Sequence, residues 1–234
     1  MNKRTVIILA AGRGERMAAN QNKILLPLLG QPILHYVLEL WLPLADAAIV
    51  VINPADRQEI ECLTAPYSDW LSLAAGGTTR AASVLAGLQA LPPAFGGSEL
   101  VAIHDAARPL TLPADIERVW QSAEKTGAAV LAAPVTDTIR FCAPNNCLGE
   151  IIPRTGLAAM QTPQVFRRTL LEQAYQAATP EDLALATDDA ALVQASGQPI
   201  SCVWASGANL KVTNPADLML AEVILKQRRS GLCV

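Results

Sequence analysis

Strand-length apolar runs alternate with helix-like segments along most of this 234-residue chain, and this alternation constrains the fold more than any other feature. The candidate strands are residues 5–10, 47–53, 71–77, 100–106 and 128–135. The helical patterns between them cover residues 32–42, 54–63, 78–91 and 113–126. Strands that are apolar on both faces and alternate with helices are typical of a parallel sheet covered on both sides. We therefore expect an α/β fold: a single Rossmann-like, three-layer αβα domain over residues 1–234, with a mostly parallel sheet.

Residues 137–155 interrupt this rhythm. The segment DTIRFCAPNNCLGEIIPR contains two short β-prone runs on either side of Pro-Asn-Asn, which is a strong turn signal. We expect an inserted β-hairpin arm here. Because an isolated two-stranded hairpin is marginally stable in water, the arm needs a surface to pack on. A second copy of the chain is the natural candidate, so the sequence predicts a homodimer.

Composition limits the classes of partner. The net charge of −3 gives no electrostatic footprint for nucleic acid, and the apolar runs are too short to predict a membrane span. The first residues lead directly into a strand, so we expect no signal peptide and a cytoplasmic location. The five cysteines form no C-x-x-C pair, and we interpret them as ordinary thiols, although Cys142 and Cys147 flank the predicted turn.

The loop after the first strand is the first candidate site. It reads IILAAGRGERM over residues 7–17, with Gly12 and Gly14 available for close backbone approach. Ligands of open α/β sheets bind beyond the carboxyl ends of the strands, where this loop lies. Met17 replaces the third glycine of G-x-G-x-x-G, and the acidic residue of that fingerprint is missing, which disfavours a dinucleotide. No Gly-Lys-Ser/Thr follows, so the loop is not a Walker A motif; a tight structural turn is the alternative.

Two cations, Arg16 and Lys23, shift the interpretation towards a polyphosphate. Backbone N–H groups together with a guanidinium and an ammonium group can clamp a chain of phosphates. In this loop the sequence resembles nucleotidyltransferases, which transfer a nucleoside monophosphate from a triphosphate to a sugar or polyol phosphate.

Further segments narrow the resemblance. They are GGTTRAASVLAGL, AIHDAARPL, APVTDTIR, MQTPQVF, ATDDAALV and NLKVTNPADLMLAE. Together they resemble the 2-C-methyl-D-erythritol 4-phosphate cytidylyltransferases of the non-mevalonate isoprenoid pathway, in the family's order and from the first strand to the last helix. The resemblance implies transfer of CMP from CTP to 2-C-methyl-D-erythritol 4-phosphate, with in-line attack of the acceptor phosphate on the α-phosphate and release of pyrophosphate.

The resemblance also implies a site for CTP. The residues expected to contact it are Ala10, Ala11, Gly12, Gly14, Gly77, Arg80, Ser83, Asp105 and Ala106. Backbone carbonyls can accept from the exocyclic amine of cytosine, and a hydroxyl can donate to its ring carbonyl, so uracil would leave acceptors unpaired. Ser83 has an alternative role as an ordinary early-helix serine. Arg80 has an alternative role in orienting the Gly77 turn.

By the same resemblance, Arg16 and Lys23 are expected to stabilise the charge that builds on the phosphoryl oxygens and on departing pyrophosphate. Mg²⁺ is implied because a triphosphate is normally bound as its metal complex. Asp105, at a strand end, is the expected metal ligand, with a helix cap as its alternative role. His104 precedes it inside the strand and is expected to be structural.

The acceptor phosphate is itself the nucleophile, and with a second pKa near 6 it needs no general base. Positioning two mutually repelling anions is the remaining task, which the family assigns to residues matching Arg154 and Lys211. The residues matching its other polyol and phosphate contacts are Arg108, Thr138, Thr162 and Thr187, with Asp188 a weaker match. Thr138 and Arg154 lie on the predicted arm, which in the family reaches into the neighbouring subunit.

The chain departs from the family pattern in places. Asn22 stands where proline is usual, Ile24 and Leu25 replace a common Gln-aromatic pair, and Thr78 stands where an acidic residue is frequent. Every proposed cation is retained, so these differences bear on acceptor specificity and rate. We also expect no fused cyclase domain of the kind that some relatives carry.

Three other functions remain open. Ribitol 5-phosphate cytidylyltransferases share the fold and the CTP loop, although HDAARP together with NLKVT favours the methylerythritol enzyme. A nucleotide-binding regulator without chemistry is disfavoured by the retained Arg16, Lys23 and Lys211. A dehydrogenase is disfavoured by Met17 and by the missing acidic residue.

Overall fold

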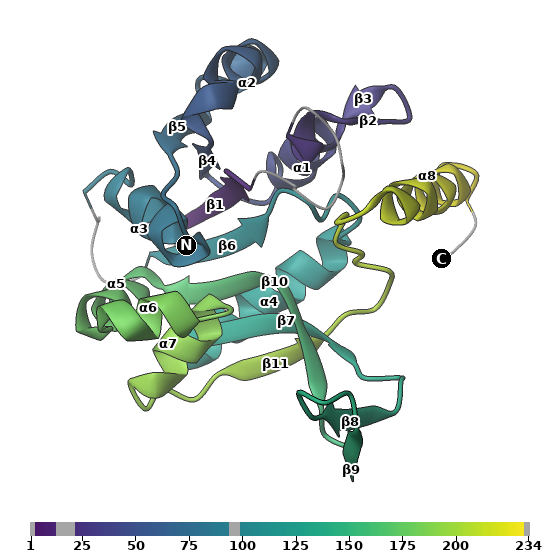
Figure 1. Cartoon of the computed structure of the whole chain (residues 1–234). Coiled ribbons are helices and arrows are strands. Elements are labelled where there is room, and N and C mark those ends of the chain that lie inside the picture. Colours follow the sequence, from purple (N-terminus) through teal and green to yellow (C-terminus); the bar gives the residue numbers. More distant parts are fainter. Residues whose placement is uncertain (1–2, 13–21, 94–98, 232–234) are drawn as a thin grey trace.

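The computed structural model describes residues 3–12, 22–93 and 99–231. The strands are β1 (Arg4–Ala10), β2 (Pro27–Leu28), β3 (Gln31–Pro32), β4 (Ala47–Ile52), β5 (Leu71–Ala75), β6 (Leu100–Asp105), β7 (Ala128–Pro134), β8 (Ile139–Cys142), β9 (Leu148–Ile152), β10 (Ala158–Arg167) and β11 (Ser201–Trp204). The α-helices are α1 (Ile33–Trp41), α2 (Arg57–Thr64), α3 (Arg80–Gln89), α4 (Pro113–Thr126), α5 (Arg168–Ala177), α6 (Pro180–Leu185), α7 (Asp189–Ala195) and α8 (Pro215–Arg229). Figure 1 shows the helices arranged around a central sheet.

The central sheet has seven strands in the order β11-β7-β10-β6-β1-β4-β5. β1 pairs in parallel with β4 and β6, and β4 with β5. β10 runs antiparallel to both β6 and β7, and it is the reason why the sheet is only mostly parallel. The predicted α/β class is therefore confirmed, although the sequence analysis had not identified β10 or β11 as strands.

Alternating residues of β1 build the two faces of the core. Val6 and Ile8 belong to a buried cluster that includes Trp41 of α1 and Trp120 of α4. Ile7 points to the other face, into a cluster formed with α3, α5 and α7. Because side chains alternate along a strand, a fully apolar run requires helices on both sides, and the chain supplies them.

The largest difference between a predicted and an observed helix start is at α2. The segment from Pro54 was expected to open a helix, but Pro54–Asp56 forms a 3₁₀ turn and α2 begins only at Arg57. The Asn53 side chain accepts a hydrogen bond from the Ala55 N–H at 3.1 Å, which caps this tight turn. By contrast, α4 spans the predicted residues, with Pro113 in its first turn and Gly127 in a left-handed conformation at its end.

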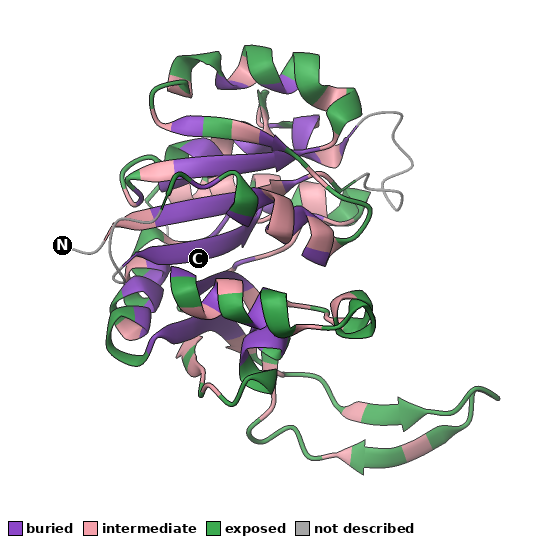
Figure 2. Ribbon diagram, turned by 90° about the vertical axis from the view of Figure 1, so that its left-hand side faces the viewer, coloured by how far each residue is buried: buried purple, intermediate pink, exposed green. Residues whose placement is uncertain are grey.

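β8 and β9 form the predicted hairpin, which extends away from the body of the molecule (Figure 2). Phe141, Leu148 and Ile151 on this arm are 60–67% exposed. Cys142 pairs across the hairpin with Leu148, and the described cysteines, Cys142 and Cys147 among them, are free thiols. Within the described ranges, no helix combines the length and apolar content needed to cross a membrane.

Helix α3 approaches the sheet closely at Gly87. A Cβ atom there would lie 2.6 Å from Ile7 Cγ2 and 3.0 Å from Val51 Cγ2. Replacing a helical glycine by alanine normally stabilises a protein by about 0.5–1 kcal/mol. We predict that Gly87→Ala reverses this sign and lowers the free energy of unfolding by about 1–3 kcal/mol, because overpacking forces the helix away from the sheet.

Urea unfolding measures this effect, with Gln89→Ala on the exposed face of α3 as a control that changes little. A stabilised Gly87→Ala protein would contradict the close packing of α3 on β1 and β4.

Candidate functional site

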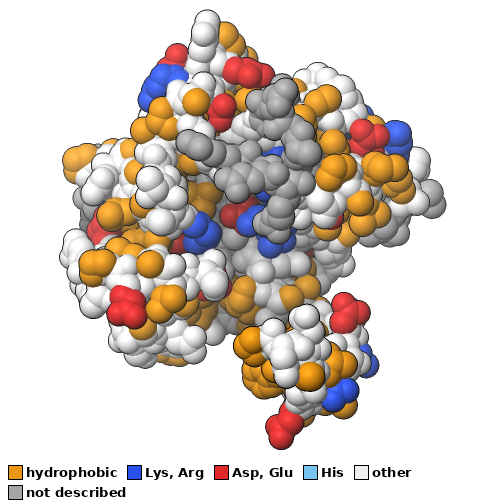
Figure 3. Space-filling view, viewed as in Figure 1, with side chains coloured by type: hydrophobic (Ala, Val, Ile, Leu, Met, Phe, Trp, Pro, Cys, Tyr) orange, Lys and Arg blue, Asp and Glu red, His pale blue; other side chains and the backbone are white. Residues whose placement is uncertain are grey.

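A cavity of about 870 Å³ opens at the carboxyl ends of four neighbouring parallel strands, β6, β1, β4 and β5. Its lining residues are Leu9–Gly12, Lys23, Ile24, Asn53, Pro54, Gly76–Arg80, Ser83, Asp105, Ala107, Lys211 and Thr213. Lys and Arg side chains gather near the middle of the molecular face shown in Figure 3. The cavity lies at the carboxyl ends of the strands, which is where open α/β sheets bind ligands. The cavity therefore combines glycine-rich backbone with cationic side chains.

The Gly76-Gly77 turn after β5 forms one wall of the cavity. A Cβ on Gly76 would lie 2.4 Å from Ala11 Cβ, so only glycine lets this turn contact the first loop. The Ser83 hydroxyl accepts a hydrogen bond from the Gly77 N–H at 3.2 Å and lies 3.0 Å from the Thr79 carbonyl. Ser83 thus fixes the Gly77 turn, the task considered for Arg80, and it also lines the cavity; its predicted contact with CTP stays a prediction.

Asn22 holds the other end of the first loop. Its Nδ2 donates to the Ala10 carbonyl at 3.0 Å and to Asp56 Oδ2 at 2.8 Å, while its Oδ1 accepts from the Ile24 N–H at 3.3 Å. This buried side chain places Lys23 at the cavity. In the sequence, Asn22 stands out only as a departure from the family pattern; an N-cap residue type next to a candidate cation was the available signal for its role. Gly14 and Arg16 lie outside the described residues.

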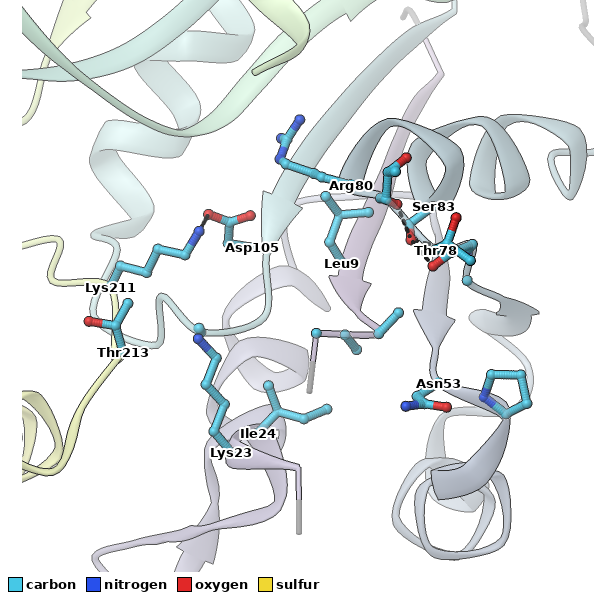
Figure 4. Close-up of a pocket in the computed structure, with 18 residues that line it drawn as sticks. Leu9, Lys23, Ile24, Asn53, Thr78, Arg80, Ser83, Asp105, Lys211 and Thr213 are labelled. Atoms are coloured by element: carbon cyan, nitrogen blue, oxygen red, sulfur yellow. Dashed lines mark hydrogen bonds and ion pairs between the residues drawn. The ribbon is translucent and has the colours of Figure 1, made fainter. Parts of the chain in front are cut away.

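Asp105, at the end of β6, is surrounded by cations. Its Oδ2 lies 2.8 Å from Lys211 Nζ and 3.6 Å from Arg108 Nε. Burial alone would raise the pKa of Asp105, but the positive charges of Lys211, Arg80 and Arg108 outweigh it and lower the pKa to about 2. Figure 4 shows Lys211 contacting Asp105, while Lys23 and Arg80 extend towards the same region from different elements. Asp105 is therefore ionised at neutral pH.

This carboxylate suits a hard cation. Among the described residues, no group of three or more His, Cys, Asp or Glu side chains could hold a metal by itself. Mg²⁺ is commonly bound by only one or two carboxylates together with substrate phosphates and water. One ionised carboxylate beside a polyphosphate-sized cavity fits that arrangement, in which the substrate completes the ligand set.

His104 supports the strand end from inside the protein. It is fully buried, and burial lowers its pKa to about 4, so the ring is neutral at pH 7. Its Nδ1 lies 3.3 Å from Thr162 Oγ1 and its Nε2 lies 3.3 Å from the Arg108 carbonyl. Thr162 Oγ1 in turn accepts from the Asp105 N–H at 3.0 Å. The carbonyl requires Nε2–H as donor, so the Thr162 hydroxyl donates to Nδ1. This arrangement fixes the backbone of Asp105.

Not all of the predicted site residues line the cavity. Those that do are Ala10, Ala11, Gly12, Lys23, Gly77, Arg80, Ser83, Asp105 and Lys211. Ala106 is fully buried and its N–H donates to the Leu9 carbonyl, so the geometry gives no support to its predicted contact with CTP. Thr162 is also buried with its hydroxyl engaged, and Arg108 Nη1 donates to the Asn209 carbonyl at 2.7 Å.

The remaining predicted acceptor residues are exposed outside the cavity: Thr138, Arg154 and Thr187. Arg154 Nη1 donates to the Thr136 carbonyl at the base of the arm. Their predicted contacts with an acceptor stay predictions. Asn209 was not predicted from the sequence. Its Nδ2 donates to the Thr162 carbonyl at 3.0 Å, and its Oδ1 accepts from Thr111 Oγ1 at 2.7 Å. Its place in NLKVT beside Lys211 was the only signal.

The Lys211–Asp105 pair generates a prediction about pH. We predict that Lys211→Met raises the pKa of Asp105 from about 2, because a major charge that favours the carboxylate is removed. In the unaltered protein the lowered pKa means that ionised Asp105 stabilises the fold above about pH 4. This contribution is lost as the pH falls from about 4 to about 2.

A carboxyl-carbon NMR titration of Asp105 measures the shift. Lys226→Met is the matched control, since Lys226 is exposed, pairs with Glu222 at 3.7 Å and does not line the cavity. An Asp105 pKa that stays at about 2 in Lys211→Met would show that other charges hold the carboxylate ionised.

Comparison with known proteins identifies the family. A family model described as 2-C-methyl-D-erythritol 4-phosphate cytidylyltransferase matches residues 4–227. A relative of that name from Synechococcus elongatus is 41% identical over 236 residues, covering 96% of this chain and 97% of the relative. One from Halalkalibacterium halodurans is 41% identical over 234 residues, covering 96% and 99%. The crystal structure of the Thermus thermophilus protein of that name superposes with a TM-score of 0.76 at 33% identity, covering 97% of this chain and 100% of that one. The chain belongs to the 2-C-methyl-D-erythritol 4-phosphate cytidylyltransferase family.

Proposed function

We propose that the protein transfers CMP from CTP to 2-C-methyl-D-erythritol 4-phosphate, giving 4-diphosphocytidyl-2-C-methyl-D-erythritol and pyrophosphate. The observation that carries this proposal is the cavity at the strand ends. There Lys23, Arg80, Lys211 and ionised Asp105 line a cavity that also has a glycine-rich wall. The chain belongs to the family that is named for this reaction. A cavity of about 870 Å³ lies within the range of small-molecule sites.

The chemistry needs positioning rather than a base. The acceptor phosphate, with a second pKa near 6, is largely dianionic at neutral pH and can attack without losing a proton. One of its oxygens forms a bond to the α-phosphorus of CTP, and the bond from that phosphorus to the bridging oxygen of pyrophosphate breaks. Lys23 and Arg16 would stabilise the charge that develops, while Lys211 would hold the two anions close together. Neutral, buried His104 has no part in proton transfer on this route.

We include Mg²⁺ in the proposal, with Asp105 as its protein ligand. The ion would offset the negative charge of the triphosphate. The protein's own contribution is to keep Asp105 ionised: Lys211 and Arg108 face its carboxylate, and Thr162 fixes its backbone N–H.

We further propose that two chains associate through the hairpin arm. The arm extends away from the body and exposes Phe141, Leu148 and Ile151, which are apolar side chains that water does not favour. Arg154 is exposed at the base of the same arm. A partner chain would cover the apolar side chains, and the anionic substrate bound in its cavity would pair with the Arg154 guanidinium. In this arrangement, Thr138 and Arg154 reach the acceptor of the partner's site.

A pyrophosphate-release assay tests the proposed reaction. CTP, UTP and GTP are each offered with 2-C-methyl-D-erythritol 4-phosphate and with ribitol 5-phosphate. Turnover that requires CTP and the methylerythritol acceptor supports the proposal. If CTP turns over with ribitol 5-phosphate but not with 2-C-methyl-D-erythritol 4-phosphate, the protein is a ribitol 5-phosphate cytidylyltransferase. No turnover with any pair of substrates would contradict an enzymatic function.

The cations near the first loop generate a second test. We predict that Lys23→Ala and Arg16→Ala each raise the barrier to transfer by about 2–4 kcal/mol, as expected for the loss of a preorganised charge that stabilises the transition state. Steady-state kinetics should show a fall of kcat with the fold intact. Lys125→Ala, which removes the same charge from an exposed site on α4, should leave kcat unchanged. A raised KM for CTP at near-normal kcat would mean that these cations bind CTP without selective stabilisation of the transition state.

The arm is tested by mixing two inactive proteins. One carries Lys23→Ala and the other carries Arg154→Ala. If Arg154 acts in the partner's site, each site of a two-fold dimer combines one chain's loop with the other chain's arm. A mixed dimer then has one site with both defects and one with neither. Random association makes half of the dimers mixed, so we expect activity to recover to about a quarter of the unaltered level.

Each variant alone, and a measurement of subunit exchange, serve as controls for the mixing experiment. If Arg154 instead serves its own chain, every site in the mixture keeps one defect. Exchange without recovered activity would therefore rule out the trans-acting arm.

A further inference from the structure

A buried carboxylate lies behind Arg80. Asp189, at the first residue of α7, is fully buried and does not line the cavity. Its Oδ2 accepts a hydrogen bond from Arg80 Nη2 at 2.7 Å, and its Oδ1 accepts one from the Tyr175 hydroxyl at 2.6 Å. Arg80 starts α3 and Tyr175 lies on α5, so three helices meet at this one carboxylate.

The charges of this group are fixed. Burial would lower the pKa of Arg80, but the negative charge of Asp189 outweighs it and raises the pKa. Burial and the same negative charge raise the pKa of Tyr175, which keeps its hydroxyl proton as a donor. Arg80 is therefore a cation whose guanidinium is held from behind by an anion that a ligand in the cavity does not reach.

The backbone at the start of α7 is held by Gln164 of β10. The N–H groups of Asp189 and Ala190 donate to Gln164 Oε1 at 3.1 and 3.0 Å. Gln164 Nε2 donates to Asp188 Oδ2 at 2.9 Å, and Asp188 Oδ1 caps α7 by accepting from the Ala191 N–H at 3.0 Å. These bonds fix the position of α7, so Asp189 is a rigid anchor rather than a mobile counter-ion.

A guanidinium has five N–H donors, and the bond to Asp189 Oδ2 uses only one of them. Arg80 lines the cavity, and its side chain extends from α3 towards the strand that carries Asp105 (Figure 4). A guanidinium that is already fixed loses less side-chain entropy when it binds a phosphate, and its hydrogen bonds to phosphate are charge-assisted.

We infer that Asp189, together with Tyr175, is a positioning residue that holds the Arg80 guanidinium in place to bind the triphosphate of the nucleotide. The inference rests on the proposed function and adds to it the residue that positions Arg80 for contact with the triphosphate. Asp189 acts only through Arg80 and touches no substrate. Arg80 then contributes to the affinity for any nucleoside triphosphate, whereas the Gly76-Gly77 turn contributes to the choice of base.

The test is a double-mutant cycle on nucleotide binding, using Arg80→Met, Asp189→Asn and the double variant. Calorimetry measures the Kd of CTP and of inorganic tripolyphosphate. We expect Arg80→Met to raise both Kd values about 10- to 100-fold, as for the loss of a charge-assisted hydrogen bond. Asp189→Asn should raise both at least about 3-fold, and the double variant should bind no more weakly than Arg80→Met alone, because Asp189 acts through Arg80.

Two further variants separate positioning from general stability. Tyr175→Phe leaves the ion pair in place and removes one hydrogen bond to Asp189, so its Kd for CTP should lie between those of the unaltered protein and Asp189→Asn. Asp115→Asn removes a comparable buried carboxylate, which pairs with Arg118 on α4 and does not line the cavity. It should lower the free energy of unfolding without changing the Kd.

Two results of the binding measurements would overturn the inference. Additive effects of Arg80→Met and Asp189→Asn would show that Asp189 does not act through Arg80. Weaker binding of CTP with unchanged binding of tripolyphosphate would place Arg80 at the base instead of the phosphates. Turnover of CTP by the unaltered enzyme is measured in parallel, so that failure of the proposed function is distinguished from failure of the inference. If Asp189→Asn does not fold, the Tyr175→Phe and Arg80→Met arms still decide the outcome.

Discussion

β1 and its neighbours β4 and β6 are buried on both faces, and the positions of the helices that pack on the sheet follow from covering them. Val6 and Ile8 pack under α1 and α4, while Ile7 packs under α3, α5 and α7. Because parallel strands must be connected through these helices, their carboxyl ends gather at one edge of the sheet. The loops that leave this edge form the cavity. The apolar interior thus fixes where polar chemistry can take place.

Charge at this edge is a matter of position. The chain has a net charge of −3, yet Lys23, Arg80 and Lys211 line one cavity around Asp105. Like charges so close together would repel one another, and the protein offsets this with carboxylates. Asp105 lies among the cations, while Asp189 pairs with Arg80 from the buried side. A bound polyphosphate would supply the remaining negative charge, which suits this cavity to an anion.

The arm obeys a different constraint. Its two strands have no helix to cover them, and Phe141, Leu148 and Ile151 remain in water in the single chain. The predicted acceptor residues Thr138 and Arg154 lie on the same excursion, outside the cavity. Under the proposed function, the acceptor side of the site is completed only when a second chain arrives. Assembly and acceptor binding would then depend on the same surface.

Features that depend on neighbouring residues could be predicted from the sequence alone. The bounds of α4 could be predicted because Pro113 suits a first helical turn and Gly127 adopts the left-handed conformation that ends a helix. The alternation of apolar strand-length runs with helical segments predicted the α/β class, and the turn signal Pro-Asn-Asn predicted the hairpin. Lys23, Asp105 and Lys211 were identified by their motifs, and they line the same cavity.

Contacts between distant segments became apparent only in the folded protein. Arg80 and Asp189 are 109 residues apart, and no local pattern indicates that they pair. The roles of Asn22 and Asn209 depend likewise on carbonyls that the fold brings to them. β10 could not be recognised as a strand, because Pro163 interrupts its β pattern and its antiparallel direction depends on the chain path. Local sequence specifies turns, caps and periodicity, whereas a buried side chain's partner is set by the packing of the whole sheet.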